Sequence, residues 1–389
     1  MKIGFQIEHL EPARGGAETY VSQFARELLA AGHEVHLIAG AFGATPKGAF
    51  TWRVMRRGLT RWSRDLHFAR AAGRAARQAG LDVVVAVGRT FGADVLQPHG
   101  GTLRGSRRQN LLLIRSGFLR ALKDGFDFAN PRIRMQLYIE AGQYADLPPP
   151  EAVAISRMVR QDMQEFYRVP EERLHLVYNG VDLKRFSPAA CEAKRAEARA
   201  ALGLAEDETC FLIIAHNFRL KGVRELIEAA ARLPRNRPWR VVVIGKAAAK
   251  PYLELAEPLG CADRLLFPGA VADVVPAYCA ADVYVQPTWY DPCSLVVLEA
   301  LASGLPVITT RFNGASELMQ DGREGYVLES PDQTEQLAQC LEHLLDPDRR
   351  RPMRQAARAA VKDHSLQQNF REMMAVFEKV KARKEAEKA

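Results

Sequence analysis

The stretch "DVYVQPTWYDPCSLVVLEALASGLPVITT", residues 282–310, decides the class of fold. Its first and last segments, 282–287 and 305–310, are short and rich in β-branched and apolar residues, as buried strands are, and the longer apolar run between them predicts a helix. Strands that alternate with helices in this way predict a parallel sheet wrapped by helices. Ligands of such sheets bind beyond the carboxyl ends of the strands.

The same alternation runs through the rest of the chain in two series. Further strands are predicted at 2–7, 34–39, 82–87, 152–156, 210–217, 240–245 and 264–269. Between the series, "YNGVDLKRFSPAACEAKR" carries the turn signals Asn-Gly and Ser-Pro. We therefore predict an α/β fold with two Rossmann-like parallel-sheet domains that face a central cleft. The first spans residues 1–180 and the second 181–365, and residues 366–389 form a C-terminal helix that packs back toward the first domain.

The composition agrees with two globular domains. The chain has 389 residues, of which 48% are hydrophobic and 26% are charged, and a domain commonly has roughly 100–200 residues. No apolar run approaches the ~20 residues that span a bilayer, and "MKIGFQIEHLEP" is too short and too polar for a signal peptide, so we interpret it as a first strand. The six cysteines form no CxxC pair, which favours reduced thiols in a cytoplasmic protein.

The positive charge of the chain is concentrated in one segment. Residues 51–140 contain 17 Arg and Lys against 6 Asp and Glu, a larger surplus than the net charge of +8 of the whole chain. This surplus predicts an anionic partner, either nucleic acid, a membrane surface or a phosphorylated acceptor, and a solvated basic face is the alternative. Nucleic acid is disfavoured because the segment lacks interleaved aromatic residues that stack on bases.

Within that segment, residues 107–126 have the pattern of a basic amphipathic helix. The sequence "RRQNLLLIRSGFLRALKDGF" alternates leucine, isoleucine and phenylalanine with arginine and lysine. Such a helix binds in the interface of an anionic membrane. The alternative is a helix that packs on its own domain.

Two loops at strand ends have the composition of anion sites. Gly15 and Gly16 open a helix after the first strand, where backbone N–H groups and the helix dipole favour a phosphate or a sugar hydroxyl. A tight strand-helix turn uses glycine as well. Arg219 and Lys221 lie between a strand and a helix in "AHNFRLKGVRELIE", which predicts a diphosphate site, with two exposed basic residues as the alternative.

The loop of the opening stretch brings two carboxylates to one helix. Pro292 fits the first helical turn, and the N–H groups of residues 293–295 are then available to a phosphate oxygen. Asp291 lies beside this position. Glu299 lies among apolar residues of the helix and needs a partner such as a ligand hydroxyl. The alternative is that Asp291 is an N-cap and Glu299 an ordinary surface residue.

A further candidate is "GRTFGADVLQPHGG", residues 88–101, in the first half of the chain. Asp94 and His99 flank a short apolar segment, and His99 precedes a Gly-Gly pair. We interpret these residues as candidates for the cleft, with a structural histidine as the alternative.

Together these motifs resemble the GT-B glycosyltransferases of the retaining family-4 (group 1) type. "YDPCSLVVLEALASGLPVITT", with "NGASELMQDGREGYVLE" after it, resembles the nucleotide-sugar site of that family, and "GGAE", "NFRLKG" and "YNGVDLKRFSP" occur in the matching order. The resemblance covers most of the chain and is strongest over 170–330. The "YDPCS" variant, "DVLQPHGG" and the basic stretch are most similar to lipopolysaccharide core glucosyltransferases, which act on a membrane-borne acceptor that contains heptose.

The resemblance implies two groups of site residues. The catalytic group consists of Lys221, Arg219, Asp291, His99 and Asp94. The donor-binding group consists of Gly15, Gly16, Ser294, Leu295 and Glu299. The cations neutralise the diphosphate, Asp291 holds hydroxyls of the transferred sugar, the glycines and two backbone N–H groups approach the phosphate, and Glu299 binds the ribose. Asp94 and His99 approach the acceptor or the sugar. The chain departs from the family in having Asp291 where glutamate is usual, and "HNFRLK" where a Gly-Arg pair precedes the lysine.

The implied activity is transfer of glucose or an N-acetylhexosamine from a UDP-sugar or another nucleotide-diphosphate sugar to a glycolipid or lipopolysaccharide-core acceptor, with retention of configuration. We expect no cofactor and no metal, a location at the inner face of the cytoplasmic membrane through residues 107–126, and no nucleic-acid partner. The alternatives are a glycosyltransferase for a soluble acceptor and an anionic-lipid-binding protein with a non-catalytic cleft. A nucleotide-cofactor dehydrogenase is disfavoured because no GxGxxG follows the first strand.

Overall fold

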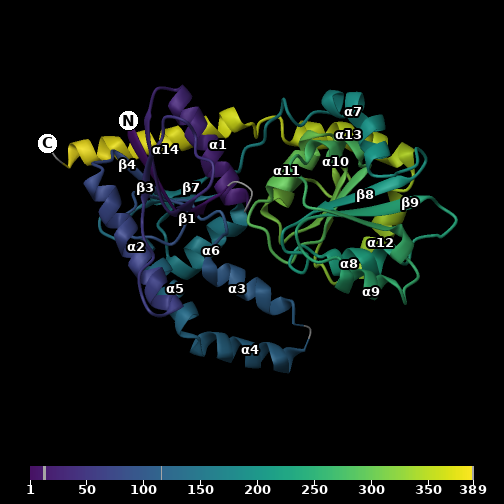
Figure 1. Ribbon diagram of the computed structural model, residues 1–389, viewed down its shortest axis with the longest axis horizontal. Coiled ribbons are helices and arrows are strands. Elements are labelled where there is room, and N and C mark those ends of the chain that lie inside the picture. The colour runs from purple at the N-terminus through teal and green to yellow at the C-terminus, as the bar shows by residue number, and fades with distance from the viewer. Residues whose placement is uncertain (12–14, 115, 388–389) are drawn as a thin grey trace. The chain divides into compact units, whose positions relative to one another are not determined.

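A computed structural model describes residues 1–11, 15–114 and 116–387 (Figure 1). The chain forms two compact units. Unit 1 comprises Met1–Tyr178 and Asn369–Ala389, and unit 2 comprises Asn179–Gln368. These limits lie within a few residues of the boundaries 180/181 and 365/366 that the sequence indicated.

Unit 1 is built on a sheet in which every described strand pair is parallel. The strands are β1 (Lys2–Leu10), β2 (Glu34–Phe42), β3 (Phe50–Arg53), β4 (Val83–Ala86), β5 (Val95–Leu96), β6 (Glu151–Ala154) and β7 (Leu174–Leu176). The helices are α1 (Gly16–Ala30), α2 (Arg61–Gln78), α3 (Leu103–Leu112), α4 (Gly117–Ala129), α5 (Pro131–Tyr144), α6 (Arg157–Tyr167) and α14 (Leu366–Ala386). The strand order is β3-β2-β1-β4-β5-β6-β7, so the direction of progression reverses between β1 and β4.

Two hydrophobic clusters cover the two faces of this sheet. On one face, Phe24 of α1 and Phe377 of α14 pack against β1, β2 and β4. Figure 1 shows α1 and α14 on the same side of this sheet. On the other face, Phe68 and Ala72 of α2 pack against residues of β2 and β4. The C-terminal helix is therefore part of the core of unit 1, and Lys379 fixes it further through an ion pair of 3.0 Å with the buried carboxylate of Glu151.

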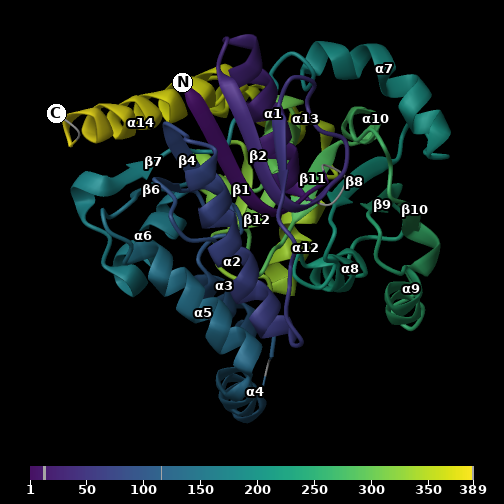
Figure 2. The ribbon, with the colours of Figure 1, turned by 60° about the vertical axis from the view of Figure 1, so that its left-hand side comes forward.

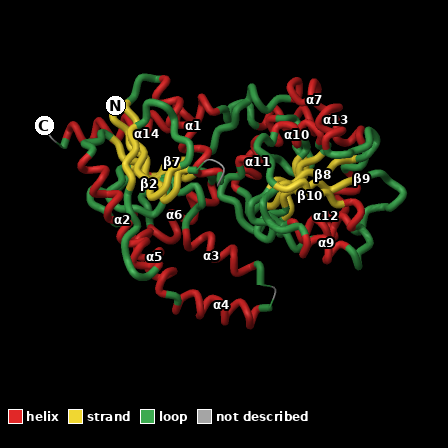
Figure 3. The backbone as a smooth tube through the Cα atoms, viewed as in Figure 1, coloured by secondary structure: helices red, strands yellow, loops and turns green. Residues whose placement is uncertain are grey.

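Unit 2 repeats the architecture with a second sheet whose described strand pairs are all parallel. The strands are β8 (Thr209–Ile214), β9 (Trp239–Ile244), β10 (Leu265–Gly269), β11 (Val283–Gln286), β12 (Val307–Thr310) and β13 (Gly325–Leu328). The helices are α7 (Pro188–Ala201), α8 (Val223–Ala230), α9 (Lys250–Ala256), α10 (Val275–Ala280), α11 (Leu295–Ala302), α12 (Thr334–His343) and α13 (Pro347–Ala360). The order β10-β9-β8-β11-β12-β13 is that of a Rossmann fold, with its reversal between β8 and β11. Figure 3 shows the strands between two layers of helices, with α8 and α12 in one layer.

The prediction of one amphipathic helix over residues 107–126 is wrong. Helix α3 ends at Leu112, and α4 begins at Gly117 after Ser116, whose hydroxyl accepts a hydrogen bond from the backbone N–H of Leu119 at 3.4 Å. A side chain that caps a helix start favours a new helix over the continuation of the previous one. Arg115 lies outside the described residues.

Helix α4 exposes the apolar side chains that were expected to face a membrane. None of its described residues is buried, and Phe118, Phe126 and Phe128 retain 77%, 67% and 68% of their surface in contact with solvent. Figures 1 and 2 show α4 away from the sheet of unit 1, beyond α3 and α5. The alternative of a helix that packs with its apolar face on its own domain is therefore wrong for α4. Across the described part of the chain, no helix combines the length and apolar character that a membrane crossing requires.

Candidate active site

The candidate site of unit 2 lies where the strand order of its sheet reverses. The loop after β8 carries Arg219 and Lys221, and the loop after β11 carries Asp291 and Ser294. Because β8 and β11 are hydrogen-bonded neighbours, their carboxyl ends bring these two loops together. A crevice at this reversal is where doubly wound sheets bind their ligands.

Gly222 holds the two loops in close contact. Its φ of 78° is in the left-handed region that side chains other than hydrogen disfavour, and a Cβ atom at this position would lie 2.0 Å from the carbonyl oxygen of Pro287. Next to it, the carbonyl oxygen of Leu220 accepts hydrogen bonds from the backbone N–H of Trp289 at 2.9 Å and from the hydroxyl of Thr288 at 3.0 Å. The position of Lys221 is therefore set by backbone packing.

Lys221 and Asp291 form an ion pair at the centre of the site. The Nζ atom of Lys221 lies 2.6 Å from Oδ2 of Asp291, and it also donates to the carbonyl oxygen of Tyr290 at 3.1 Å. The side chain of Lys221 exposes only 19% of its surface to solvent, and that of Asp291 only 13%. Gln286, at the end of β11, donates from Nε2 to the same Oδ2 atom at 3.3 Å and accepts from the hydroxyl of Ser294 at 3.0 Å. These contacts fix the orientation of the Asp291 carboxylate.

The start of the following helix differs from the prediction. Helix α11 begins at Leu295 with Ser294 as its N-cap, so Pro292 lies outside the helix. The backbone of Asp291 pairs instead with the segment 312–314, because its N–H donates to Phe312 at 2.9 Å and its carbonyl accepts from Gly314 at 2.8 Å. The expectation of a free N–H on Ser294 is also wrong, since this group donates to Oδ1 of Asn313 at 3.3 Å.

Glu299 occupies a separate environment on α11. Its Oε2 atom accepts a hydrogen bond of 2.8 Å from the hydroxyl of Tyr278, which belongs to α10. Burial raises the pKa of Glu299 to about 7, while the hydrogen bond from Tyr278 and the charge of Arg185 act in the opposite direction. The alternative of an ordinary surface glutamate is therefore wrong.

Arg219 is the exposed cation of this site. Its guanidinium makes no hydrogen bond or ion pair with any side chain or backbone group in the described parts of the chain. An exposed guanidinium on the loop that also carries the paired Lys221 is available to an anionic ligand.

The candidates of unit 1 lie at two ends of its sheet. Gly15 is the N-cap of α1 and Gly16 its first residue, with no side chain capping the helix; residues 12–14 of the same loop lie outside the described chain. His99 follows β5, whereas Asp94 precedes it. Asp94 accepts from the N–H of Val84 at 2.8 Å and from Lys384 at 2.7 Å, so its carboxylate holds α14 to the sheet. The structure does not bring Asp94 and His99 together.

His99 is a neutral imidazole packed on an aromatic ring. Its ring centroid lies 4.2 Å from that of Tyr20, and burial lowers the pKa of His99 to about 3. The Nε2 atom has no hydrogen-bond partner among the residues that the structure describes. A neutral ring with a free nitrogen can exchange a hydrogen bond with a hydroxyl group of a ligand.

Sequence reasoning missed three polar residues of the unit 2 site. Gln286 carried a usable signal, because a polar residue at the carboxyl end of a buried strand points to the ligand edge of the sheet. Tyr278 and Asn313 carried none, because their partners Glu299 and Ser294 are 21 and 19 positions away in the sequence. Within the described ranges, no cluster of three or more His, Cys, Asp or Glu side chains is arranged to hold a metal ion.

Two family models match the chain, one on each half. The model described as Glycosyltransferase Family 4 matches residues 14–185, and the model described as Glycosyl transferases group 1 matches residues 194–360. The two matches together leave only the ends of the chain and a short linker uncovered.

Similar proteins were found among both sequences and structures. The chain is 34% identical over 204 residues to alpha-D-kanosaminyltransferase of Streptomyces kanamyceticus, a match that covers 51% of this chain and 52% of that protein. It is 30% identical over 186 residues to the lipopolysaccharide glucosyltransferase WaaG of Escherichia coli, which covers 47% of this chain and 50% of that protein. The chain spans about half the length of the curated relatives that it matches.

Two solved structures align over almost the whole chain. The crystal structure of WaaG, a glycosyltransferase involved in lipopolysaccharide biosynthesis, matches 96% of this chain and 98% of its own with a TM-score of 0.82 at 23% identity. The structure of Anabaena HepE in complex with UDP matches 97% of this chain and 100% of its own with a TM-score of 0.74 at 17% identity.

The two parallel sheets, each with a reversal in its strand order, and the alignment with WaaG define a protein of the GT-B class of α/β fold. With its first half matching the family 4 model and its second half the group 1 model, the chain belongs to these glycosyltransferases.

Replacement of Gly222 tests the packing that positions Lys221. We expect Gly222→Ala to lower the free energy of unfolding by ~3 kcal/mol or more, because the new Cβ adds a clash with Pro287 to an unfavourable φ. Gly203→Ala is the matched control: φ is 65° there and nothing lies within 4 Å of the added Cβ, so the expected cost is only ~1 kcal/mol. Urea unfolding measures both values, and equal costs would contradict the close approach.

Proposed function

We propose that this chain is a retaining glycosyltransferase that moves glucose or an N-acetylhexosamine from a UDP-sugar to a glycolipid or lipopolysaccharide-core acceptor. The observation that carries the proposal is the Lys221–Asp291 pair of 2.6 Å at the strand reversal of unit 2, beside the unpaired guanidinium of Arg219. A cation and a carboxylate at this position suit a ligand that carries both a diphosphate and a sugar. The likeness to WaaG and to HepE, whose structure contains UDP, supports the choice of donor and acceptor.

The charges of the site suit the departure of a nucleoside diphosphate. Breaking the bond between the sugar and the phosphate builds negative charge on the leaving group. Lys221 and Arg219, together with the start of α11, which carries about half a positive charge, stabilise that charge in the transition state. Removal of one such donor typically costs ~3 kcal/mol of transition-state stabilisation. We propose that these groups act without a metal ion.

The two carboxylates have separate roles in this proposal. Asp291 accepts hydrogen bonds from hydroxyl groups of the transferred sugar while Gln286 keeps its carboxylate in place. Glu299 accepts hydrogen bonds from the ribose, and Tyr278 orients it from the side. The transferred sugar keeps its anomeric configuration because the acceptor hydroxyl attacks from the face that the diphosphate leaves.

Unit 1 is proposed to bind the acceptor. His99 contributes a neutral ring nitrogen to a sugar hydroxyl, and Gly15 and Gly16 offer the uncapped start of α1 to the donor phosphate. The contacts of Asp94 with Val84 and Lys384 support a structural role for this carboxylate.

Helix α4 is proposed to hold the enzyme at the inner face of the cytoplasmic membrane. Its exposed phenylalanines are suited to the boundary between headgroups and acyl chains, and the basic surplus of residues 51–140 is suited to anionic lipid. This location gives access to a membrane-borne acceptor.

Replacement of Lys221 tests the proposed catalytic site. We expect Lys221→Ala to lower the rate of sugar transfer at least ~10²-fold, because one donor to the developing diphosphate charge is lost. The assay measures UDP release from UDP-glucose and UDP-N-acetylglucosamine with a truncated lipopolysaccharide core as acceptor.

The control for this measurement is Lys250→Ala, which removes an exposed lysine of α9 and should change the rate less than twofold. Addition of EDTA should also leave the rate of the parent protein unchanged. Near-normal turnover of Lys221→Ala would contradict the site, and a parent protein that transfers no sugar from any nucleotide sugar would favour an anionic-lipid-binding protein.

The raised pKa of Glu299 predicts that donor affinity depends on pH. The hydroxyls of a ribose bind the ionised carboxylate more strongly than the protonated one, and a carboxyl with a pKa of about 7 is largely protonated at pH 6. The affinity for UDP-glucose should therefore rise about tenfold from pH 6 to pH 8, as the ionised fraction rises. Isothermal titration calorimetry measures this change. Glu299→Gln should bind more weakly and with a flat pH profile; a slope that survives in this variant would assign the titration to another group.

The exposed face of α4 predicts binding to anionic vesicles. Replacing Phe118, Phe126 and Phe128 with serine should weaken binding to phosphatidylglycerol vesicles at least ~10-fold, and added salt should weaken binding of the parent protein. The control is the pair Leu259→Ser and Val271→Ser, which alters exposed apolar residues of unit 2. Equal binding of the parent to neutral vesicles at every salt concentration would contradict the electrostatic contribution, and transfer that needs no membrane would favour a soluble acceptor.

A further inference from the structure

Unit 1 contains a cavity whose chemistry the proposed function has not used. Its volume is about 250 Å³, and it lies between the end of β1, the segments after β3 and β4, and the N-terminal halves of α2 and α5. The charged residues that line it are Glu8, Arg56, Asp65, Arg89 and Arg132. It is therefore located at the strand reversal of unit 1, the position at which doubly wound sheets bind ligands.

Two arginines of this cavity share one carboxylate. Arg56 forms a close ion pair with Oδ1 of Asp65, and Nε of Arg132 lies 3.0 Å from Oδ2 of the same side chain. Gln136 donates a further hydrogen bond of 3.2 Å to that oxygen. A single carboxylate balances the charge of one guanidinium, so one positive charge remains, and both guanidiniums keep N–H groups for a further acceptor.

A third arginine is only loosely paired. Nη2 of Arg89 lies 3.7 Å from Oε1 of Glu8, which is longer than a hydrogen bond. The cavity as a whole thus has three guanidiniums and two carboxylates. A planar guanidinium binds the paired oxygens of a phosphate or a carboxylate with two parallel hydrogen bonds.

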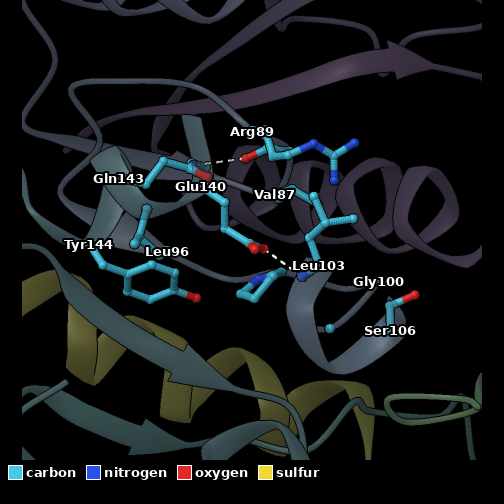
Figure 4. A pocket seen from close by; sticks show the side chains of 13 residues that line it. Val87, Arg89, Leu96, Gly100, Leu103, Ser106, Glu140, Gln143 and Tyr144 are labelled. Carbon is cyan, nitrogen blue, oxygen red and sulfur yellow. Dashed lines mark hydrogen bonds between the residues drawn. The ribbon is translucent and has the colours of Figure 1, made fainter. Parts of the chain in front are cut away.

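Arg89 also lines a second cavity, of about 110 Å³, in which Glu140 contributes a carboxyl group (Figure 4). There, Glu140 accepts from the N–H of Leu103 at 2.7 Å and from Tyr167, and burial raises the pKa of Glu140. Gln143 donates to the carbonyl oxygen of Gly88 at 3.0 Å. Amide, carboxyl and backbone groups of this kind suit the hydroxyls of a sugar ring.

We infer that unit 1 binds an acceptor sugar that carries an anionic substituent, a phosphate ester or a carboxylate, between Arg56, Arg89 and Arg132. The sugar ring occupies the adjoining cavity beside Glu140 and Gln143, and Arg89 contacts both parts. This inference rests on the proposed function in its choice of a sugar as ligand. The excess of guanidinium charge over carboxylate charge makes the larger cavity selective for anions over neutral sugars.

Direct binding of simple sugars to the full-length protein tests the inference. The probes are galactose, galactose 6-phosphate and galacturonate, titrated by calorimetry with UDP at saturation so that the Lys221 site is occupied. We expect at least one anionic sugar to bind ten times or more tightly than galactose, with an affinity that falls as sodium chloride is added. The tighter of the two anionic probes identifies phosphate or carboxylate as the group that is recognised.

Variants of the arginines assign the binding to this cavity. Arg132→Gln should weaken the anionic sugar at least tenfold and leave UDP binding unchanged, and Asp65 keeps its pair with Arg56 in this variant. Arg89→Gln should also weaken binding of the anionic sugar at least tenfold, and it replaces Arg132→Gln in the measurement if that variant does not fold. The matched control is Arg134→Gln, which alters an exposed arginine of the same helix outside both cavities.

Two outcomes would overturn the inference: equal binding of all three sugars, or an anionic sugar whose affinity is the same in Arg132→Gln and Arg89→Gln as in the parent. Failure of the proposed function has a different signature. In that case UDP produces no binding heat, while binding of the anionic sugar still depends on Arg132.

Discussion

The close approach of the loops after β8 and β11 is the constraint on which the unit 2 site depends. Gly222 has no Cβ, so the backbone of its loop lies against Pro287, and this contact places Lys221 beside Asp291. The side chains of Lys221 and Asp291 are both largely shielded from water. A shielded charge that loses its partner destabilises the folded protein. Each side chain therefore holds the other in place. A ligand that brings its own negative charge to Lys221 and its own hydroxyls to Asp291 can replace this mutual stabilisation without leaving either group unpaired.

The same topological feature occurs twice in the chain. Both sheets reverse their strand order, between β1 and β4 in unit 1 and between β8 and β11 in unit 2. At a reversal, the connections on either side leave toward opposite faces, so the strand ends between them stay uncovered. In unit 2 this edge carries the Lys221–Asp291 pair, and in unit 1 it carries the cavity of Arg56, Arg89 and Arg132. One rule of sheet topology thus accounts for the place of both sites, while the side chains decide the chemistry of each.

The sequence predicted the features that depend on local pattern. Buried strands were visible as apolar runs, and Lys221 and Asp291 were visible because they lie in the loops that follow such runs. Contacts between distant elements were not visible: the hydrogen bond from Tyr278 to Glu299 joins two helices, and the bond from Ser294 to Asn313 follows from an isolated bridge between loops. The break between α3 and α4 was missed because the capping side chain of Ser116 outweighs an otherwise continuous helical pattern.

Asp291 is found at a position where the family that the chain resembles usually has glutamate. The contacts of this shorter side chain indicate how it can still bind a sugar. The contacts from Lys221 and Gln286 both fall on Oδ2, and Oδ1 accepts no hydrogen bond from the described residues. One oxygen of the carboxylate is thus held by the protein, and the other is left to a ligand. Because aspartate has one methylene fewer than glutamate, it also has one fewer rotatable bond, so the two contacts on Oδ2 are enough to fix where Oδ1 points. In the proposed reaction, Asp291 extends less far toward the sugar than a glutamate would. Its Oδ1 atom is already fixed in direction, however, so it loses little conformational entropy when the sugar binds, and this smaller entropy cost compensates for the shorter side chain.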